Sequence, residues 1–204
     1  HDAYVPGALA TAQEDWGDYL KGETLEGEAF PFVRRVGDLA IISCSSAVPT
    51  APFMAIGRFE EKQAARLARI LKLMGDAGYF RTVLIPHPPN AELQPPSFGL
   101  KGHRLFRQVI AEHGAELVLH GHSHLPTLGW LGKRGVRIPV VGVAAAGQAP
   151  GGRHPASQYN LFEIDGAPDA WRIRLTRRGL SRPALPPADL ETVELGVEPE
   201  AVRS

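Results

Sequence analysis

The chain has 204 residues, 44% of them hydrophobic and 22% charged, which is ordinary for a single domain that buries a core. Its 22 basic and 22 acidic residues cancel, and this balance argues against a non-specific grip on long nucleic acid or an anionic membrane. The single cysteine, Cys44, excludes an internal disulfide framework and a multi-cysteine zinc site.

No apolar run approaches the roughly 20 residues that a membrane-spanning helix needs, and no signal peptide is visible. We therefore expect no membrane span and a cytoplasmic location. The chain begins with His1 rather than Met, so a signal peptide lost ahead of residue 1 stays an alternative. The sequence does not indicate an oligomeric state.

The first predicted elements are a hairpin and a helix. Residues 30–47 contain the two-residue turn signal Gly37-Asp38 between two apolar stretches, which predicts two antiparallel strands. Cys44 is expected to be buried in the second of them. Residues 58–78 carry apolar side chains at a spacing of about 3.6 residues, which predicts an amphipathic helix.

Two short buried strands are predicted next, at 81–86 and 115–120, with a second amphipathic helix between them at 103–114. Strand, helix, strand, helix, strand is the alternation of an α/β fold. Ligands of such sheets gather beyond the carboxyl ends of the strands. His87 follows the first strand and residues 120–124 end the second, so these histidines should meet at one edge of the sheet.

The pattern then changes to that of antiparallel strands. Residues 127–147 predict a pair of strands, and 158–165 and 170–178 alternate apolar and polar side chains. The Pro- and Glu-rich remainder, 179–204, is predicted to be an extended or disordered tail. The expected organisation is therefore one domain over 1–178, followed by that tail.

The letters HGHSH place His120, His122 and His124 at the end of a predicted strand. In an extended or turning segment, residues i and i+2 point to the same side, and Gly121 lets the backbone bend tightly. His122 and His124 are therefore predicted to converge on one metal ion or on a close pair, and imidazole suits zinc, iron, manganese and nickel. Incidental histidines on a polar loop are the alternative.

His87 is a third candidate ligand, because the prolines on both sides of it stiffen the backbone. A chance histidine in a surface turn is the alternative. His103, His113 and His154 have no histidine or carboxylate companion at ligand spacing, and we expect them to be packed or surface residues.

Together these segments resemble the calcineurin-like metallophosphoesterases. HGHSH contains that family's G-H-x-H signature, and VLIPHPP at 83–89 is similar to its single-histidine motif at a strand end. GRFEEKQAARLARIL at 57–71 resembles the helix before that motif, including Gln63. The opening HD resembles the end of the family's G-N-H-D motif. Order and spacing match from residue 1 to about 178.

The resemblance implies an α/β fold of the α+β type, the C-terminal portion of a four-layer αββα sandwich with mixed sheets. It also implies a dinuclear centre of two divalent or transition metal ions, Mn, Fe or Zn. His87 and His122 would bind one ion and His124 the other. His1 would act near the leaving group as general acid or transition-state stabiliser, with Asp2 orienting it. His120 is not a ligand in this pattern.

The family's D-x-H and G-D-x-x-D motifs, which supply the bridging aspartate, would lie before residue 1. The chain is therefore expected to be the C-terminal part of such a domain, with little or no turnover by itself. Reading the residues upstream would test this expectation.

The implied function is metal-dependent hydrolysis of a phosphoester. A small phosphodiester, for example a cyclic nucleotide, is favoured over long nucleic acid because the domain is small and its net charge is zero. A phosphomonoesterase with the same site is the nearest alternative, and a non-catalytic scaffold that binds a protein partner is one of another class. A mononuclear zinc hydrolase using His87, His122 and His124 is the third.

Overall fold

The computed structural model describes residues 11, 14–51, 53–90, 98–132, 136–182 and 185–195. Its helices include the 3-10 helix η1 (Gly17–Leu20) and the α-helices α2 (Glu61–Asp76) and α3 (His103–His113). Its strands are β1 (Glu23–Thr24), β2 (Phe32–Val36), β3 (Leu39–Ser43), β4 (Gly57–Arg58), β5 (Phe80–Ile85), β6 (Leu100–Lys101), β7 (Leu117–His120), β8 (Leu128–Leu131), β9 (Ile138–Gly142), β10 (Gln158–Asp165), β11 (Arg172–Gly179) and β12 (Ala188–Glu194).

The largest sheet has seven strands in the order β1-β2-β3-β5-β7-β9-β8. Strands β3, β5, β7 and β9 are parallel, whereas β2 and β8 run antiparallel to their neighbours β3 and β9. The predicted hairpin is confirmed as β2 and β3, with Gly37-Asp38 in its turn. The alternation β3-α2-β5-α3-β7 is confirmed as well, so the fold is a mixed α/β structure of the α+β type.

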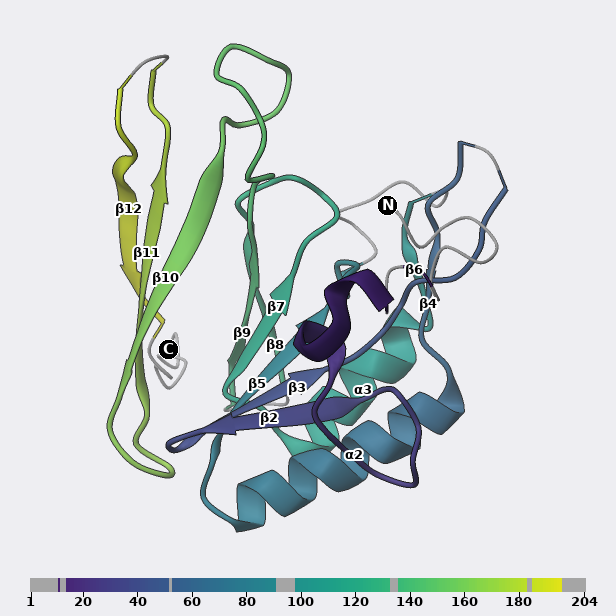
Figure 1. Ribbon diagram of the computed structural model, residues 1–204. Coiled ribbons are helices and arrows are strands. Elements are labelled where there is room, and N and C mark those ends of the chain that lie inside the picture. The colour runs from purple at the N-terminus through teal and green to yellow at the C-terminus, as the bar shows by residue number, and fades with distance from the viewer. Residues whose placement is uncertain are drawn as a thin grey trace, which may run out of the picture.

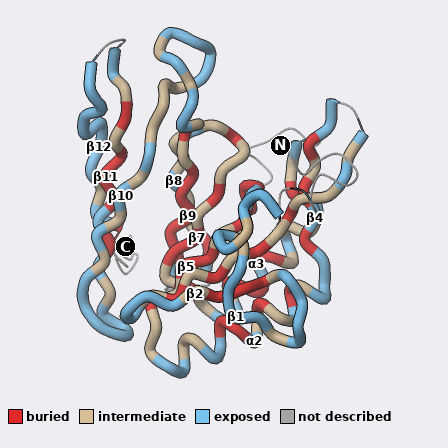
Figure 2. The backbone as a smooth tube through the Cα atoms, in the orientation of Figure 1, coloured by how far each residue is buried: buried red, intermediate tan, exposed pale blue. Residues whose placement is uncertain are grey.

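Side chains that alternate along the central strands divide the core into two parts. Val83 and Val118 pack with the buried faces of α2 and α3, whereas Leu117 and Val141 pack with the three-stranded sheet β10-β11-β12. Successive side chains of a strand point to opposite faces, and both faces of these strands are therefore buried. Figure 1 shows α2 and α3 on one side of the sheet and β10 to β12 on the other, and Figure 2 shows the burial of the central strands.

Helix α2 begins at Glu61, later than the predicted start at residue 58, because Gly57–Arg58 forms β4. This strand pairs in parallel with β6 in a separate two-stranded sheet. The pairing ties the segment before α2 to the segment before α3, beside the carboxyl ends of the central strands. It therefore helps to shape the edge where the histidines lie.

The three-stranded sheet β10-β11-β12 extends past the predicted domain boundary. Strand β12 lies inside the expected tail, pairs with β11, and leads to Leu195, which is only 1% exposed. Acidic side chains of β12 pair with arginines of β11, as in Arg178–Asp189 at 2.6 Å. The boundary after residue 178 therefore cuts through a sheet, and the ordered fold continues to Leu195. Part of the Pro- and Glu-rich segment that was predicted to be an extended or disordered tail therefore forms an edge strand.

The described residues form three layers, namely the α2 and α3 layer, the seven-stranded sheet and the three-stranded sheet. The fourth layer implied by the resemblance stays a prediction. None of the helices in the described ranges is long and apolar enough to cross a membrane.

Candidate metal centre

The candidate site lies beyond the carboxyl ends of β5 and β7. Pairing between these strands ends at Ile85 and His120, and the Gly121 N–H then donates to the Pro86 carbonyl at 3.1 Å. This extra bond holds the two chain segments together past the end of the sheet. As a result His87 and His122 lie side by side, with ring centroids 4.2 Å apart and planes inclined by 37°.

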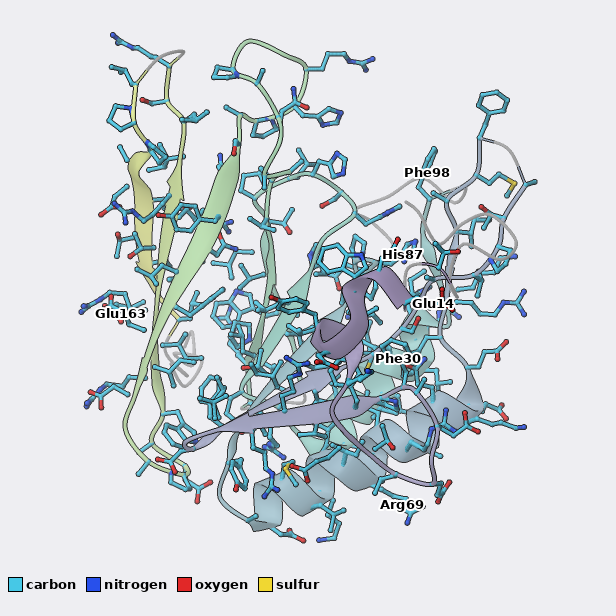
Figure 3. All side chains as sticks on the ribbon, viewed as in Figure 1. Glu14, Phe30, Arg69, His87, Phe98 and Glu163 are labelled. Carbon is cyan, nitrogen blue, oxygen red and sulfur yellow. The ribbon has the colours of Figure 1, made fainter. Side chains whose placement is uncertain are left out.

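His87 is completely buried and held at both ring nitrogens. Its Nε2 lies 3.0 Å from the Ala55 carbonyl oxygen and its Nδ1 lies 2.8 Å from Ser46 Oγ. A carbonyl can only accept, so Nε2 carries the proton and Nδ1 accepts from the hydroxyl. The ring is therefore neutral with a defined orientation, and a metal ion bound to it would replace one of these two bonds. Figure 3 labels His87 in the interior near the strand ends.

Burial also determines the protonation of the histidine pair. Burial lowers the pKa of His87, although the bond to the Ala55 carbonyl opposes the change. Burial, followed by the neighbouring His87, lowers the pKa of His122 to about 4. Both imidazoles are therefore neutral at physiological pH, which is the form that binds a metal ion.

The backbone of HGHSH is unusual at two of its histidines. His122 has a φ of 66° and His124 a φ of 55°, in the left-handed region that non-glycine residues rarely adopt. Such conformations cost about 1–3 kcal/mol each and cluster at functional sites. The turn directs the two histidines differently, because His122 stacks beside His87 while the ring of His124 lies 6.0 Å from that of His154.

His154 was missed by the sequence reasoning, which placed it among the histidines without a companion. The structure brings its ring edge-to-face with His124, at an interplanar angle of 76°. Its loop follows β9 and is distant in sequence, and no spacing rule could have linked the two residues. A second pair of imidazoles therefore lies next to the first.

His120 is engaged within the protein at both nitrogens. Its Nδ1 donates to the Gly121 carbonyl at 3.0 Å, and its Nε2 accepts from the Thr127 hydroxyl at 3.2 Å. The side chain is 5% exposed, and burial lowers its pKa. Because both nitrogens of His87 are engaged in the same way, this arrangement does not separate the two residues, and the expectation that His120 is not a metal ligand stays a prediction.

Two further observations bear on whether these residues fit a metal centre. The Ser123 hydroxyl, between His122 and His124, is buried and has no hydrogen-bond partner within the described ranges. A buried hydroxyl is costly unless it is satisfied, which indicates that another polar group belongs here. No group of three or more His, Cys, Asp or Glu side chains in the same ranges is arranged to hold a metal ion. The neutral His87 and His122 therefore fit a metal centre as part of its ligand set, and further ligand atoms are needed to complete that set.

The two remaining predicted site residues, His1 and Asp2, lie outside the described residues. A cavity of about 500 Å³ adjoins His122 and His124 and is also lined by Tyr159 and Asn160 of β10. It offers room for a small ligand next to the histidines.

Residues that support His87 were not identified from the sequence. Ser46 follows β3, the strand beside β5, so the rule that ligands gather at strand ends could have found it. Gly57 lies so close to His87 that a Cβ there would come within 2.6 Å of the ring carbon Cγ. Only the tertiary structure shows why a glycine is needed at this position.

No family model matches the chain, and no curated protein matches it. The family resemblance therefore rests on the sequence motifs alone.

Proposed function

We propose that this chain carries metal-binding residues of a phosphoester hydrolase. The observation that carries the proposal is the pair of neutral imidazoles, His87 and His122, stacked 4.2 Å apart at the carboxyl ends of parallel strands. Strained backbone at the same turn supports it, as does the buried Ser123 hydroxyl, which has no hydrogen-bond partner among the described residues.

In this proposal His87 and His122 hold one metal ion and His124 contributes to a second. Bound in a pair, such ions would supply an acidified water and offset the charge of a phosphoryl group. The chain's own residues prepare the site. Ser46 and the Ala55 carbonyl fix the orientation of the His87 ring, and burial keeps both imidazoles unprotonated.

His1 and Asp2 take their roles from the resemblance alone. We propose that His1 protonates or stabilises the departing alkoxide, and that Asp2 orients the His1 ring. A histidine acts well in this role because its ordinary pKa lies near neutral pH.

The proposed substrate is a small phosphodiester, with a monoester as the nearest alternative. The cavity of about 500 Å³ beside His122 and His124 suits a small ligand, and the net charge of zero disfavours a long polyanion. We propose a cytoplasmic location, which fractionation of the source cells would check.

The test compares His122→Ala with His113→Ala in the full-length protein. His113 is an exposed histidine at the end of α3 and serves as the matched control. Titration calorimetry with Mn²⁺ and Zn²⁺ should show at least 100-fold weaker metal binding in His122→Ala, since removal even of outer-shell partners costs about 10- to 100-fold. Binding by His113→Ala should equal that of the unmodified protein.

Hydrolysis is followed with bis-p-nitrophenyl phosphate and p-nitrophenyl phosphate at a fixed Mn²⁺ concentration. We expect the diester to be cleaved faster, and the activity to disappear in His122→Ala. Metal binding without any hydrolysis would favour the scaffold alternative, and one metal ion per chain by elemental analysis would favour the mononuclear one. Equal metal binding by the two variants would refute the proposal.

A further inference from the structure

A basic pocket of about 720 Å³ lies between helix α3 and strand β8, and its lining includes His103 but none of the histidines of the candidate metal centre. Strand β8 is the last strand of the seven-stranded sheet, so the pocket is at its edge. Arg104 and Arg107 line it from α3, Trp130 from β8, and Arg137 from the residue before β9. Among the described lining residues there is no aspartate or glutamate.

These arginines differ from most others in the chain. Most arginines elsewhere in the described ranges are paired with acids, as in Arg81–Glu116 at 2.6 Å and Arg177–Glu191 at 2.9 Å. None of the ion pairs found in the described parts of the chain includes Arg104, Arg107 or Arg137. In a chain with a net charge of zero, the pocket thus concentrates positive charge that no described acid neutralises.

Two of the guanidinium groups are held in position by neighbours that leave their charge intact. Arg137 lies over the ring of Trp130, with its Cζ 4.4 Å from the ring centroid. Arg107 donates from Nη1 to Asn90 Oδ1 at 3.1 Å. A guanidinium that is already oriented loses less entropy when it binds a ligand, and its planar fork matches phosphate oxygens in pairs.

We propose that this pocket binds a small ligand carrying a di- or triphosphate group. Three guanidinium groups, two from α3 and one from the residue before β9, suit several phosphate oxygens, and the volume of this open pocket, about 720 Å³, is in the range of small-molecule sites. Long nucleic acid is disfavoured because the chain has no net positive charge. The phosphate group can belong to a free polyphosphate or to a nucleotide.

The test titrates the full chain with inorganic tripolyphosphate and, separately, with ADP. EDTA is present throughout, so that metal ions near His87 contribute nothing. We expect one site per chain and a dissociation constant below about 100 µM, which weakens as salt is added because exposed charges are screened. Tryptophan fluorescence should change on binding, and Trp130→Phe should remove most of that change.

Arg104→Gln combined with Arg107→Gln is expected to weaken binding at least tenfold, because a hydrogen bond from a charged group to phosphate typically accounts for a factor of about ten or more. The matched control combines Arg153→Gln with Arg182→Gln. These two arginines are exposed, lie outside the pocket and form none of the ion pairs in the described ranges, so the control removes the same charge. Thermal unfolding of both double variants verifies that they fold.

Tighter binding of ADP than of tripolyphosphate would support a nucleotide ligand, and equal binding would support recognition of the phosphates alone. The proposal is overturned if neither compound binds, or if the control loses as much affinity as the pocket variant. It is also overturned if a DNA oligonucleotide or an acidic peptide binds this pocket while both small compounds do not.

Discussion

Basic side chains form both the histidine pair at the ends of β5 and β7 and the arginine pocket beside β8. The histidines are neutral, however, whereas the arginines are positively charged. His87 is buried and His122 partly buried, and burial lowers their pKa values so that they carry no charge. Arg104, Arg107 and Arg137 are exposed and keep their charge. Burial therefore decides which ligand we propose for each site, a cation for the neutral histidines and an anion for the charged arginines.

The largest expected effect comes from filling the space beside His87. In Gly57→Ala the new Cβ would meet the buried imidazole, which must then shift away from Ser46 and Ala55. We expect a loss of about 3 kcal/mol in the free energy of unfolding, as for other overpacked cores, together with a loss of metal binding. Urea denaturation and calorimetry measure both quantities.

Gly147→Ala is the matched control, because no atom lies within 4 Å of the position of its Cβ. Its stability and metal binding should remain unchanged. Phosphate binding at the arginine pocket should survive in both variants. Loss of function at both sites in Gly57→Ala would show that the two regions are not independent.

The second effect is the pH dependence of stability without metal. Burial lowers the pKa of His122 to about 4 from an ordinary value of 6.5, and His87 and His120 shift in the same direction. Between these values the unfolded chain takes up protons that the folded chain does not, so stability falls as the pH is lowered from about 6.5 towards 4. We expect a decrease of about 1.5 kcal/mol from pH 7 to pH 5, after allowance for partial solvent screening.

Urea denaturation at the two pH values in EDTA measures this decrease. His122→Gln should show a smaller pH dependence, whereas Arg104→Gln should leave it unchanged, since arginine stays protonated throughout this range. A pH dependence that is the same in His122→Gln as in the unmodified protein would contradict the assigned protonation of the pair.

The smallest effect is expected from Ser46→Ala, which removes the hydroxyl bonded to His87 Nδ1. The buried ring nitrogen then lacks a partner, at a cost of about 1 kcal/mol. When the metal ion takes the place of the Ala55 bond at Nε2, Ser46 remains the outer partner of the ring, and its loss should weaken metal binding by about tenfold, because outer hydrogen bonds orient ligating histidines. Ser45→Ala is a suitable control, because its backbone rather than its side chain bonds to Gln63. Equal metal binding by the two serine variants would show that Ser46 does not position His87.

The periodicity of apolar residues in the sequence was sufficient to predict the helices and strands at the centre of the fold. The 3.6-residue pattern located α2 and α3, and the positions of His87 and HGHSH at strand ends correctly predicted that these segments meet. Contacts between distant loops were not predictable in this way, since the pairing of His124 with His154 depends on how the chain returns after β9. Strand β12 was missed because its acidic residues resemble those of a solvated tail.

The arginine pocket could not be predicted either. Arg104 and Arg107 lie on α3, whereas Arg137 lies just before β9, about 30 residues later in the sequence. The net charge of zero gives no indication that these three arginines lie close together. Their significance appears only when the ion pairs of the other arginines are known.

Crystals soaked in Zn²⁺ and measured at the zinc absorption edge would test the central claim most directly. The account predicts an anomalous peak at the His87–His122 pair, about 2.0–2.1 Å from a ring nitrogen of each histidine. It also predicts that His87 gives up its bond to either Ser46 or the Ala55 carbonyl. An intact pair of rings with both His87 hydrogen bonds in place and no zinc beside them would contradict it.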